Sequence, residues 1–306
     1  METETIESLR PLLLSIAYRM LGGVSDAEDI VQEALLRYHR ELDAGVVIRS
    51  PKAFLSAIVT RLAIDHLRSA QARRETYVGQ WIPEPMLTDG DTDALASAEL
   101  SESISLAFLL LLERLGPVER AVFLLHDVFA YDYDEIAVIV GKTEANCRQL
   151  AARARRHIAS GKPRFEASRQ ARDELAARFF AAVTDGEMDG LVAMLAGDVT
   201  VYGDGGGKAP QWAAPIVGSD RVARLLVGLG RQMREAGVRL ELRQVNGQPG
   251  ALVRDPTGKL ISVFALDISD GTVRAIRSVI NPDKLRHLGP VADVYALLRR
   301  QRQGAP

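Results

Sequence analysis

Apolar residues recur every three or four positions through the first half of the chain. Ile6, Leu9, Leu13 and Ile16 have this spacing, which places them on one face of a helix. The pattern continues to about Arg164 with almost no strand-like alternation. We therefore predict that the first half is all helical.

A polar stretch interrupts the helical pattern over residues 76–103. Pro83, Pro85 and several glycine, aspartate and threonine residues in this stretch are typical of a linker. We expect the linker to separate a first helical bundle, residues 1–75, from a second bundle, residues 104–165.

The pattern changes again after residue 165. One helix is predicted over residues 172–195, and runs with strand-like composition follow at 199–202, 238–245, 260–266 and 273–279. Residues 166–306 are therefore predicted to form a third domain of the α+β class.

Composition narrows the kinds of function that fit. The chain has 38 basic and 40 acidic residues, so a nucleic-acid surface requires local clustering of lysine and arginine. Cys147 is the single cysteine, which excludes an intrachain disulfide, and the five histidines share no ligand spacing. The most apolar run ends at Glu113, and the N-terminus is acidic. We expect a cytoplasmic protein that spans no membrane and holds no metal or cofactor.

The second predicted bundle contains a helix-turn-helix pattern. Gly141 has the position of the turn, and Thr143 that of the N-cap of the second helix. The inward-facing positions are apolar or small: Ile136, Ala137, Val140, Cys147 and Leu150. Recognition helices meet base edges near their start, where this chain has Lys142, Thr143, Glu144, Asn146, Arg148 and Gln149.

Basic residues cluster on and after the same helix. Residues 133–165 contain seven lysines and arginines, Arg153 and Arg156 among them, against three acidic residues. An ordinary helical hairpin with a basic surface is the alternative interpretation. DNA binding explains the cluster better, because the basic residues coincide with the helix-turn-helix pattern.

Two polar surfaces of the first bundle each admit two interpretations. Ser25, with Glu28 three residues later, is a capping-box signature. The outward face of the helix that begins there is either solvated, which the pattern alone favours, or protein-binding; it consists of Asp26, Glu28, Asp29, Gln32 and Glu33. A second helix, from about Pro51, ends in a cluster that either balances the helix dipole or holds phosphates: Arg61, Arg68, Arg73 and Arg74.

The order of these parts resembles the extracytoplasmic-function sigma factors. The resemblance rests on AYRMLGGVSDAEDIVQEALLRYHRE, SPKAFLSAIVTRLAIDHLRSAQARR and LERLGPVERAVFLLHDVFAYDYDEIAVIVGKTEANCRQLAARARR, and covers essentially all of residues 5–160. It implies that the two bundles are sigma region 2 and sigma region 4, and that the chain directs core RNA polymerase to promoter DNA.

The resemblance also implies roles for individual residues. The acidic face would bind the β′ clamp helices of the polymerase, which reverses the interpretation from the pattern alone, and the β flap would be a further contact. Residues expected to read the promoter −10 region are Thr60, Arg61, Asp65, Arg68, Arg73 and Arg74. The helix-turn-helix would read the −35 element, with the six residues around its second helix start and with Arg153 and Arg156.

Three further motifs resemble those of a sigma-factor subfamily with a fused SnoaL-like domain: WIPEP at 81–85, DGGGK at 204–208 and NPDKL at 281–285. This resemblance implies a cone-shaped α+β barrel over residues 166–306 that regulates the sigma regions in cis. The residues expected at the regulatory contact are Trp81, Pro83, Asp204, Gly205, Gly206, Gly207, Lys208, Asn281, Pro282, Asp283, Lys284 and Leu285.

Local roles for these motifs stay open. DGGGK also fits a glycine turn after a strand, and NPDKL fits a turn with Asp283 capping a short helix. We nevertheless expect DGGGK, the linker and the end of the first bundle to form one interdomain contact, with Trp81 docked on a neighbouring domain.

Two other functions are alternatives to a sigma factor. One is a helix-turn-helix regulator that binds its operator alone and senses a ligand. The other is a SnoaL-like enzyme, but nothing in the spacing pairs its candidate acid–base groups, Asp204, Asp220, Asp267 and His287. We expect no catalysis, a C-terminal pocket that holds a small ligand of unidentified class, and a chain that is monomeric when free.

Overall fold

The computed structural model describes residues 2–74, 77–89, 102–159 and 168–303. The chain divides into a helical unit, residues 1–76 and 92–162, and a C-terminal unit, residues 77–91 and 163–306. Part of the predicted linker, residues 77–91, therefore belongs to the C-terminal unit. Within the described residues, no helix is both long and apolar enough to cross a membrane.

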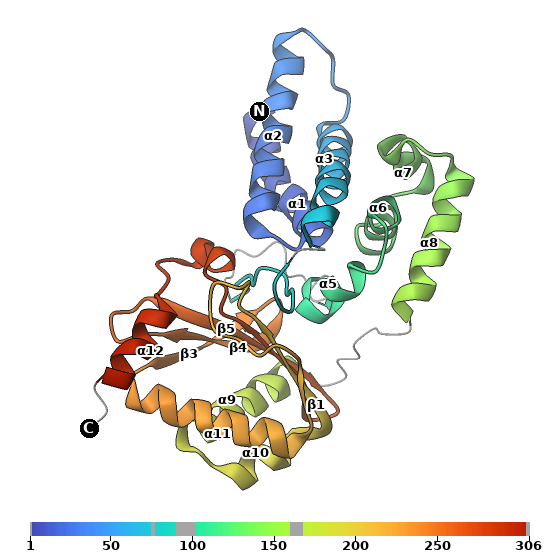
Figure 1. Cartoon of the computed structure of the whole chain (residues 1–306). Helices are drawn as coiled ribbons and strands as arrows, with labels where there is room; N and C mark the ends of the chain where they lie inside the picture. The colour runs from blue at the N-terminus through green and yellow to red at the C-terminus, as the bar shows by residue number, and fades with distance from the viewer. Residues whose placement is uncertain (1, 75–76, 90–101, 160–167, 304–306) are drawn as a thin grey trace. The chain divides into compact units, whose positions relative to one another are not determined.

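The helical unit contains the two predicted bundles (Figure 1). Its elements are α1 (Glu2–Leu21), α2 (Val24–Asp43), α3 (Pro51–Arg74), η1 (Glu102–Ile104), α5 (Leu106–Leu112), α6 (Pro117–Phe123), the π-helical turn η2 (Leu124–Val128), α7 (Tyr133–Val140) and α8 (Glu144–Ala159). The N-cap of α2 is Gly23, and Ser25 lies exposed in the first turn, so the predicted capping box at Ser25 is wrong. The helix begins earlier because Gly22, with φ +71°, turns the chain directly after α1.

The C-terminal unit is a mixed sheet with helices on one face (Figure 1). Its elements are α9 (Arg169–Asp185), α10 (Met188–Met194), β1 (Leu195–Asp204), β2 (Ile216–Val217), α11 (Ser219–Glu235), β3 (Arg239–Val245), β4 (Gln248–Arg254), β5 (Leu260–Ser269), β6 (Thr272–Val279), η3 (Pro282–Lys284), η4 (Arg286–Leu288) and α12 (Val294–Gln303). The strand order is β2-β1-β6-β5-β4-β3, in which β1 and β6 are parallel and the other pairs antiparallel. The sheet is open, with β2 and β3 at its edges, rather than a closed barrel.

Glycine turns explain where the sequence prediction of this unit was inaccurate. The single helix predicted over residues 172–195 is broken at Gly186, which ends α9 with φ +79°. Asn246 and Gly247, both with positive φ, form the tight turn that connects β3 to β4. Strand β4 was not predicted, because its Pro249 and Gly250 hide the strand pattern.

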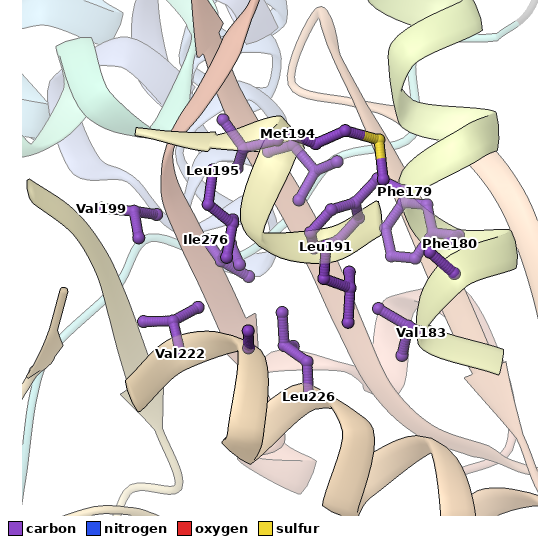
Figure 2. Close-up of a cluster of buried hydrophobic side chains, with 14 of the residues drawn as sticks. Phe179, Phe180, Val183, Leu191, Met194, Leu195, Val199, Val222, Leu226 and Ile276 are labelled. Carbon is purple, nitrogen blue, oxygen red and sulfur yellow. The ribbon is translucent and has the colours of Figure 1, made fainter. Parts of the chain in front are cut away.

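The core of this unit lies between the sheet and helices α9, α10 and α11. Figure 2 shows Phe179 and Leu191 facing Leu226 and Ile276 across this layer. Each of these side chains is at most 4% exposed. The burial of these side chains attaches the three helices to one face of the sheet.

Candidate nucleic-acid interface

The turn between α7 and α8 has the geometry of a helix-turn-helix. Gly141 ends α7 in the left-handed region, with φ +64°. The Thr143 hydroxyl accepts a hydrogen bond from the Asn146 amide at 3.3 Å, which confirms the predicted cap of α8. On the inner side Cys147 is fully buried, and this burial raises the pKa of its thiol, as expected for a packing residue.

The start of α8 presents an exposed polar surface. All six side chains predicted to read DNA there are exposed: Lys142, Thr143, Glu144, Asn146, Arg148 and Gln149. The Arg148 guanidinium pairs with the Glu144 carboxylate at 2.8 Å and lies 5.4 Å from the centre of the Tyr133 ring. These contacts hold Arg148 against its own motif while leaving it accessible from solvent.

The two further arginines of α8 differ in their partners. Arg153 donates two hydrogen bonds to the buried carboxylate of Glu119, at 3.0 and 3.2 Å, and this pairing raises the pKa of Arg153. Among the residues that the structure describes, Arg156 donates to the carbonyl of Ala152 on its own helix. Arg153 therefore ties α8 to α6, whereas Arg156 remains oriented along the surface.

The predicted acidic face of α2 is exposed and ordered. Asp26, Glu28, Asp29 and Gln32 are exposed, and the opposite side of the helix is anchored by buried apolar residues such as Ile30 and Val31. Glu33 pairs with Arg37 at 2.6 Å, and the hydrogen bond from Arg37 lowers the pKa of Glu33. His66 of α3 lies 3.5 Å from Asp26.

Two of the α3 residues predicted to read the −10 region, Thr60 and Arg61, are covered or engaged within the helical unit. Arg61 donates to the carbonyls of Val138 and Ile139, at 2.8 Å each, at the C-terminal end of α7. Thr60 is fully buried, so a DNA contact by Thr60 requires a rearrangement of its surroundings.

The remaining predicted −10 residues lie toward the end of α3. Asp65 and Arg68 are exposed and pair with each other at 3.2 Å. Arg73 and Arg74 belong to the helix, but their side chains lie outside the described part of the chain.

Buried polar contacts attach residues 77–89 to the C-terminal unit. The fully buried Asp204 accepts hydrogen bonds from the Ile82 amide at 2.8 Å, from the Lys284 ammonium at 2.6 Å and from the Tyr77 hydroxyl. Asn281 donates to the Tyr77 hydroxyl at 2.9 Å. We call Tyr77, Ile82, Asp204, Asn281 and Lys284 the linker node.

Lys284 connects both motifs of the C-terminal unit to the WIPEP segment. Its ammonium lies 4.5 Å from the centre of the Trp81 ring and 4.9 Å from that of Tyr77. It also donates to the carbonyl of Ile82 at 2.5 Å. Pro83 and Leu285 are buried next to these residues in the sequence. The indole therefore packs on a buried cation within its own unit.

The glycines of DGGGK leave room for the linker. Gly206 has φ +57°, and a Cβ atom there would lie 2.1 Å from the amide nitrogen of Asn281. At Gly207, with φ +70°, a Cβ atom would lie 3.2 Å from Val78. A Cβ atom at Gly205 would lie 2.4 Å from the carbonyl oxygen of Ala209 in the same loop. The motif is thus both a turn and a contact surface.

The NPDKL motif caps itself and pairs with DGGGK. The N-cap of η3 is Asn281, whose side-chain oxygen accepts from the Asp283 amide at 3.1 Å, so the predicted cap at Asp283 is wrong. Pro282 follows at the first helical position, where a proline loses no hydrogen bond. The Asp283 carboxylate instead forms an ion pair with Lys208.

The residues that follow WIPEP run along the edge strand β3 of the sheet. Leu87 forms an isolated antiparallel bridge with Val245 of β3, and the Thr88 amide donates to the carbonyl of Gln244 at 2.9 Å. The Asn246 side chain accepts from the Met86 amide at 2.9 Å. Residues 77–89 are therefore fixed at both ends on the C-terminal unit.

Comparisons with known proteins agree with this arrangement. The Sigma-70 region 2 family matches residues 5–73, and the Sigma-70, region 4 family matches residues 105–158. The ECF RNA polymerase sigma factor SigJ of Mycobacterium tuberculosis is 41% identical over 301 residues, 93% of each chain. The chain belongs to the extracytoplasmic-function sigma factors. In the same species, a probable ECF sigma factor named SigI is 34% identical over 285 residues and covers 90% of this sigma factor and 92% of its own length.

The likeness to SigJ extends to its crystal structure. That structure matches 95% of this sigma factor and 100% of its own chain, with a TM-score of 0.75 and 38% identity. The sigma factor therefore combines helical regions 2 and 4 with a C-terminal unit that is built on a mixed sheet. Alternative sigma factors direct RNA polymerase to particular promoters, which is the function of this family.

Sequence reasoning missed several residues of the linker attachment. Tyr77, Thr88, Asn246 and the residues around Gln244 belong to no motif, and their pairing depends on contacts between segments more than 120 positions apart. The signal that was available is Asn246-Gly247, a dipeptide typical of a tight hairpin turn. It would have indicated β4 and the edge on which the sigma factor holds its linker.

Proposed function

We propose that this sigma factor binds core RNA polymerase through the acidic face of α2 and reads the −35 element with the start of α8. The exposed, capped start of α8 is the observation that supports this most directly, because its side chains need no rearrangement to enter a major groove. The acidic face would pair with the β′ clamp helices, and region 4 would contact the β flap. Chemistry belongs to the polymerase, and the sigma factor acts with it in the cytoplasm without a catalytic step of its own.

We further propose that promoter binding requires region 2 to separate from α7. Arg61 is expected to exchange its bonds to the two α7 carbonyls for the −10 DNA, and Thr60 to become accessible in the same step. Asp65 and Arg68, already exposed, would contact the same region of DNA, with Arg73 and Arg74 holding phosphates. The free chain thus keeps part of its DNA-reading surface covered.

The C-terminal domain is proposed to regulate this separation through the linker. Residues 77–89 lie between regions 2 and 4 in the sequence, and the linker node holds them on the C-terminal unit. Because the bound length of linker cannot extend, the domain limits how far the two regions can move apart. The participants are Trp81, Pro83, the DGGGK residues and the NPDKL residues. A further contact with the end of the first bundle stays a prediction.

A binding experiment separates this proposal from an operator-binding regulator. The sigma factor and its R148A variant would be mixed with promoter DNA in the presence and absence of core polymerase, at several salt concentrations. We expect sequence-specific binding only with polymerase, and lower specificity at −35 with R148A. An R156A variant removes a charge of the same helix farther from its start, and we expect it to lower affinity for all promoter sequences about equally, whereas R148A should change the preference among them. Specific binding by the sigma factor without polymerase would support the operator-binding alternative.

A further inference from the structure

A second site lies in the C-terminal unit, next to the stretch of chain that leads into the linker node. A cavity of about 670 Å³ opens on the inner face of the sheet, the face that also carries the core. Strands β4, β5 and β6 form its floor, the C-terminal half of α11 one wall, and α12 another. This volume lies within the range of about 300–1,000 Å³ that is typical of small-molecule sites. We call this cavity the inner pocket.

The walls of the inner pocket are mostly apolar. Trp212 and Phe264 pack against the core but are only partly buried, so their ring faces extend the core into the cavity. Leu229 and Met233 of α11 and Val253 of β4 complete the apolar lining around them. Binding is favourable when an apolar molecule displaces water from a surface of this kind.

Two serines place a polar spot on the floor of the inner pocket. Ser262 on β5 and Ser278 on β6 line the cavity and are only 4% and 3% exposed. Ser278 is paired across the strands with Phe264, two residues after Ser262, so both hydroxyls lie on the same face of neighbouring strands. Because both residues line the cavity, a bound molecule can reach their hydroxyls.

The lining residues that the structure describes offer little charge to balance an ionised ligand. Among the lining residues the charged side chain is that of Asp255. Its Oδ1 already accepts hydrogen bonds from the Thr257 amide, the Thr257 hydroxyl and the Lys259 amide, at 2.8, 2.7 and 2.9 Å. An anion would meet no cation among the described lining residues, and a cation would have to approach a carboxylate whose Oδ1 already accepts three hydrogen bonds. The chemistry of the lining selects a neutral molecule.

Helix α12 contributes one of its faces to the lining of the inner pocket. Val294, Leu297 and Leu298 have the spacing of one helix face, and all three line the cavity. The segment before α12 is fixed to β5, because the Leu260 amide and carbonyl bond to Pro290 and Ala292, at 2.8 Å each. The helix itself is held less firmly, since none of its described side chains is buried. An anchored base and a loosely packed apolar face are the features of a lid.

We propose that the inner pocket binds a neutral, largely apolar small molecule with one hydrogen-bonding group, which meets Ser262 and Ser278, and that α12 closes over it. The pocket residues Ser278 and Ile280 lie three positions and one position before Asn281 of the linker node. A ligand that contacts Ser278 and Ile280 would therefore restrain the end of β6 and the residue that precedes the linker node. Binding itself does not depend on the promoter function, because it is a property of the free chain.

The test uses a neutral fluorescent probe, N-phenyl-1-naphthylamine, with the full-length chain. The sequence has two tryptophans, so a W81F variant leaves Trp212 as the reporter inside the inner pocket. We expect saturable probe fluorescence with one site per chain, and quenching of Trp212 emission over the same concentration range. The comparison ligand is 8-anilino-1-naphthalenesulfonate, which has the same rings and an added sulfonate, and it should bind at least tenfold more weakly.

Variants on one helix locate the bound probe. L297D places a charge on the face of α12 that lines the pocket and should lower probe affinity at least tenfold, whereas Y295D alters a 45% exposed neighbour and should leave it unchanged. The S262A/S278A pair should lower affinity severalfold, by about the strength of one or two hydrogen bonds. Equal affinities for wild type and L297D, or equal binding of the neutral and sulfonated probes, would overturn the proposal. Because no polymerase is present, these outcomes leave promoter selection untouched.

Discussion

Replacing Asp204 with alanine should weaken the C-terminal unit and release the linker. The carboxylate is fully buried and is the counterion of Lys284, which is 7% exposed, at 2.6 Å. Removal of one partner of a buried ion pair leaves the other charge uncompensated, at a cost of about 3–5 kcal/mol. The bonds to the Ile82 amide and the Tyr77 hydroxyl are lost together with the pair. We therefore expect D204A to lower the free energy of unfolding of this unit by about 3–5 kcal/mol.

Both tryptophans report on this unit specifically. Trp81 and Trp212 belong to residues 77–91 and 163–306, so urea unfolding followed by tryptophan emission measures the C-terminal transition. The matched variants are K284M and the double variant D204A/K284M, in which no buried charge remains. The double variant should cost less than the sum of the two single variants by about 1–3 kcal/mol. Additive costs, or a D204A transition at the wild-type urea concentration, would refute the assignment of a buried, linker-holding ion pair.

Further predictions concern the surfaces of the sigma factor and the protonation of its linker node. R148A should lower discrimination at the −35 element by about 1–3 kcal/mol in holoenzyme binding to single-base promoter variants; an unchanged preference would remove Arg148 from the reading set. D29K should weaken binding to core polymerase in a salt-dependent manner, which co-purification at increasing salt would measure; salt-independent binding equal to wild type would contradict a charged contact. R61A should accelerate amide hydrogen exchange at the end of α7, because two carbonyl acceptors lose their donor. The variant should also lower the fraction of promoter DNA that is opened. Unchanged exchange would contradict the packing of α7 on α3. Burial, and then the Asp204 carboxylate, raises the pKa of Tyr77. The neutral hydroxyl therefore contributes to stability below pH about 10, and this contribution is lost as the pH rises further. The difference in tyrosinate absorbance between wild type and Y77F should show a tyrosine that ionises above the ordinary pKa, and a difference at the ordinary pKa would contradict the linker node.

The helical half of the fold was predictable because its signals are local. Apolar spacing indicated the helices, Gly141 marked the turn, and Thr143 caps α8 as expected. The exact start of α2 was not predictable from Ser25, since two glycines upstream begin the helix earlier. Capping signatures compete with glycine turns, and here the turn decided where the helix begins.

The C-terminal unit was less predictable because its contacts are long-range. The sequence indicated that WIPEP, DGGGK and NPDKL act together, but only as a resemblance between motifs. The atoms that join them are the Asp204 carboxylate, the Lys284 ammonium and the Ile82 backbone, which come from three segments. Nothing in the spacing of Ser262 and Ser278 reveals a cavity either, because a pocket is defined by what the chain leaves unfilled.

The most direct test of the account is transcription in vitro with purified core polymerase on a promoter library. The full chain would be compared with its D29K and R148A variants and with residues 1–165. We expect initiation that requires core polymerase and is selective for promoter sequence. It should be lost with D29K, change its −35 preference with R148A, and change in amount when residues 166–306 are removed. Polymerase-dependent initiation without sequence selection, or none from any form of the chain together with no binding to core polymerase, would contradict it.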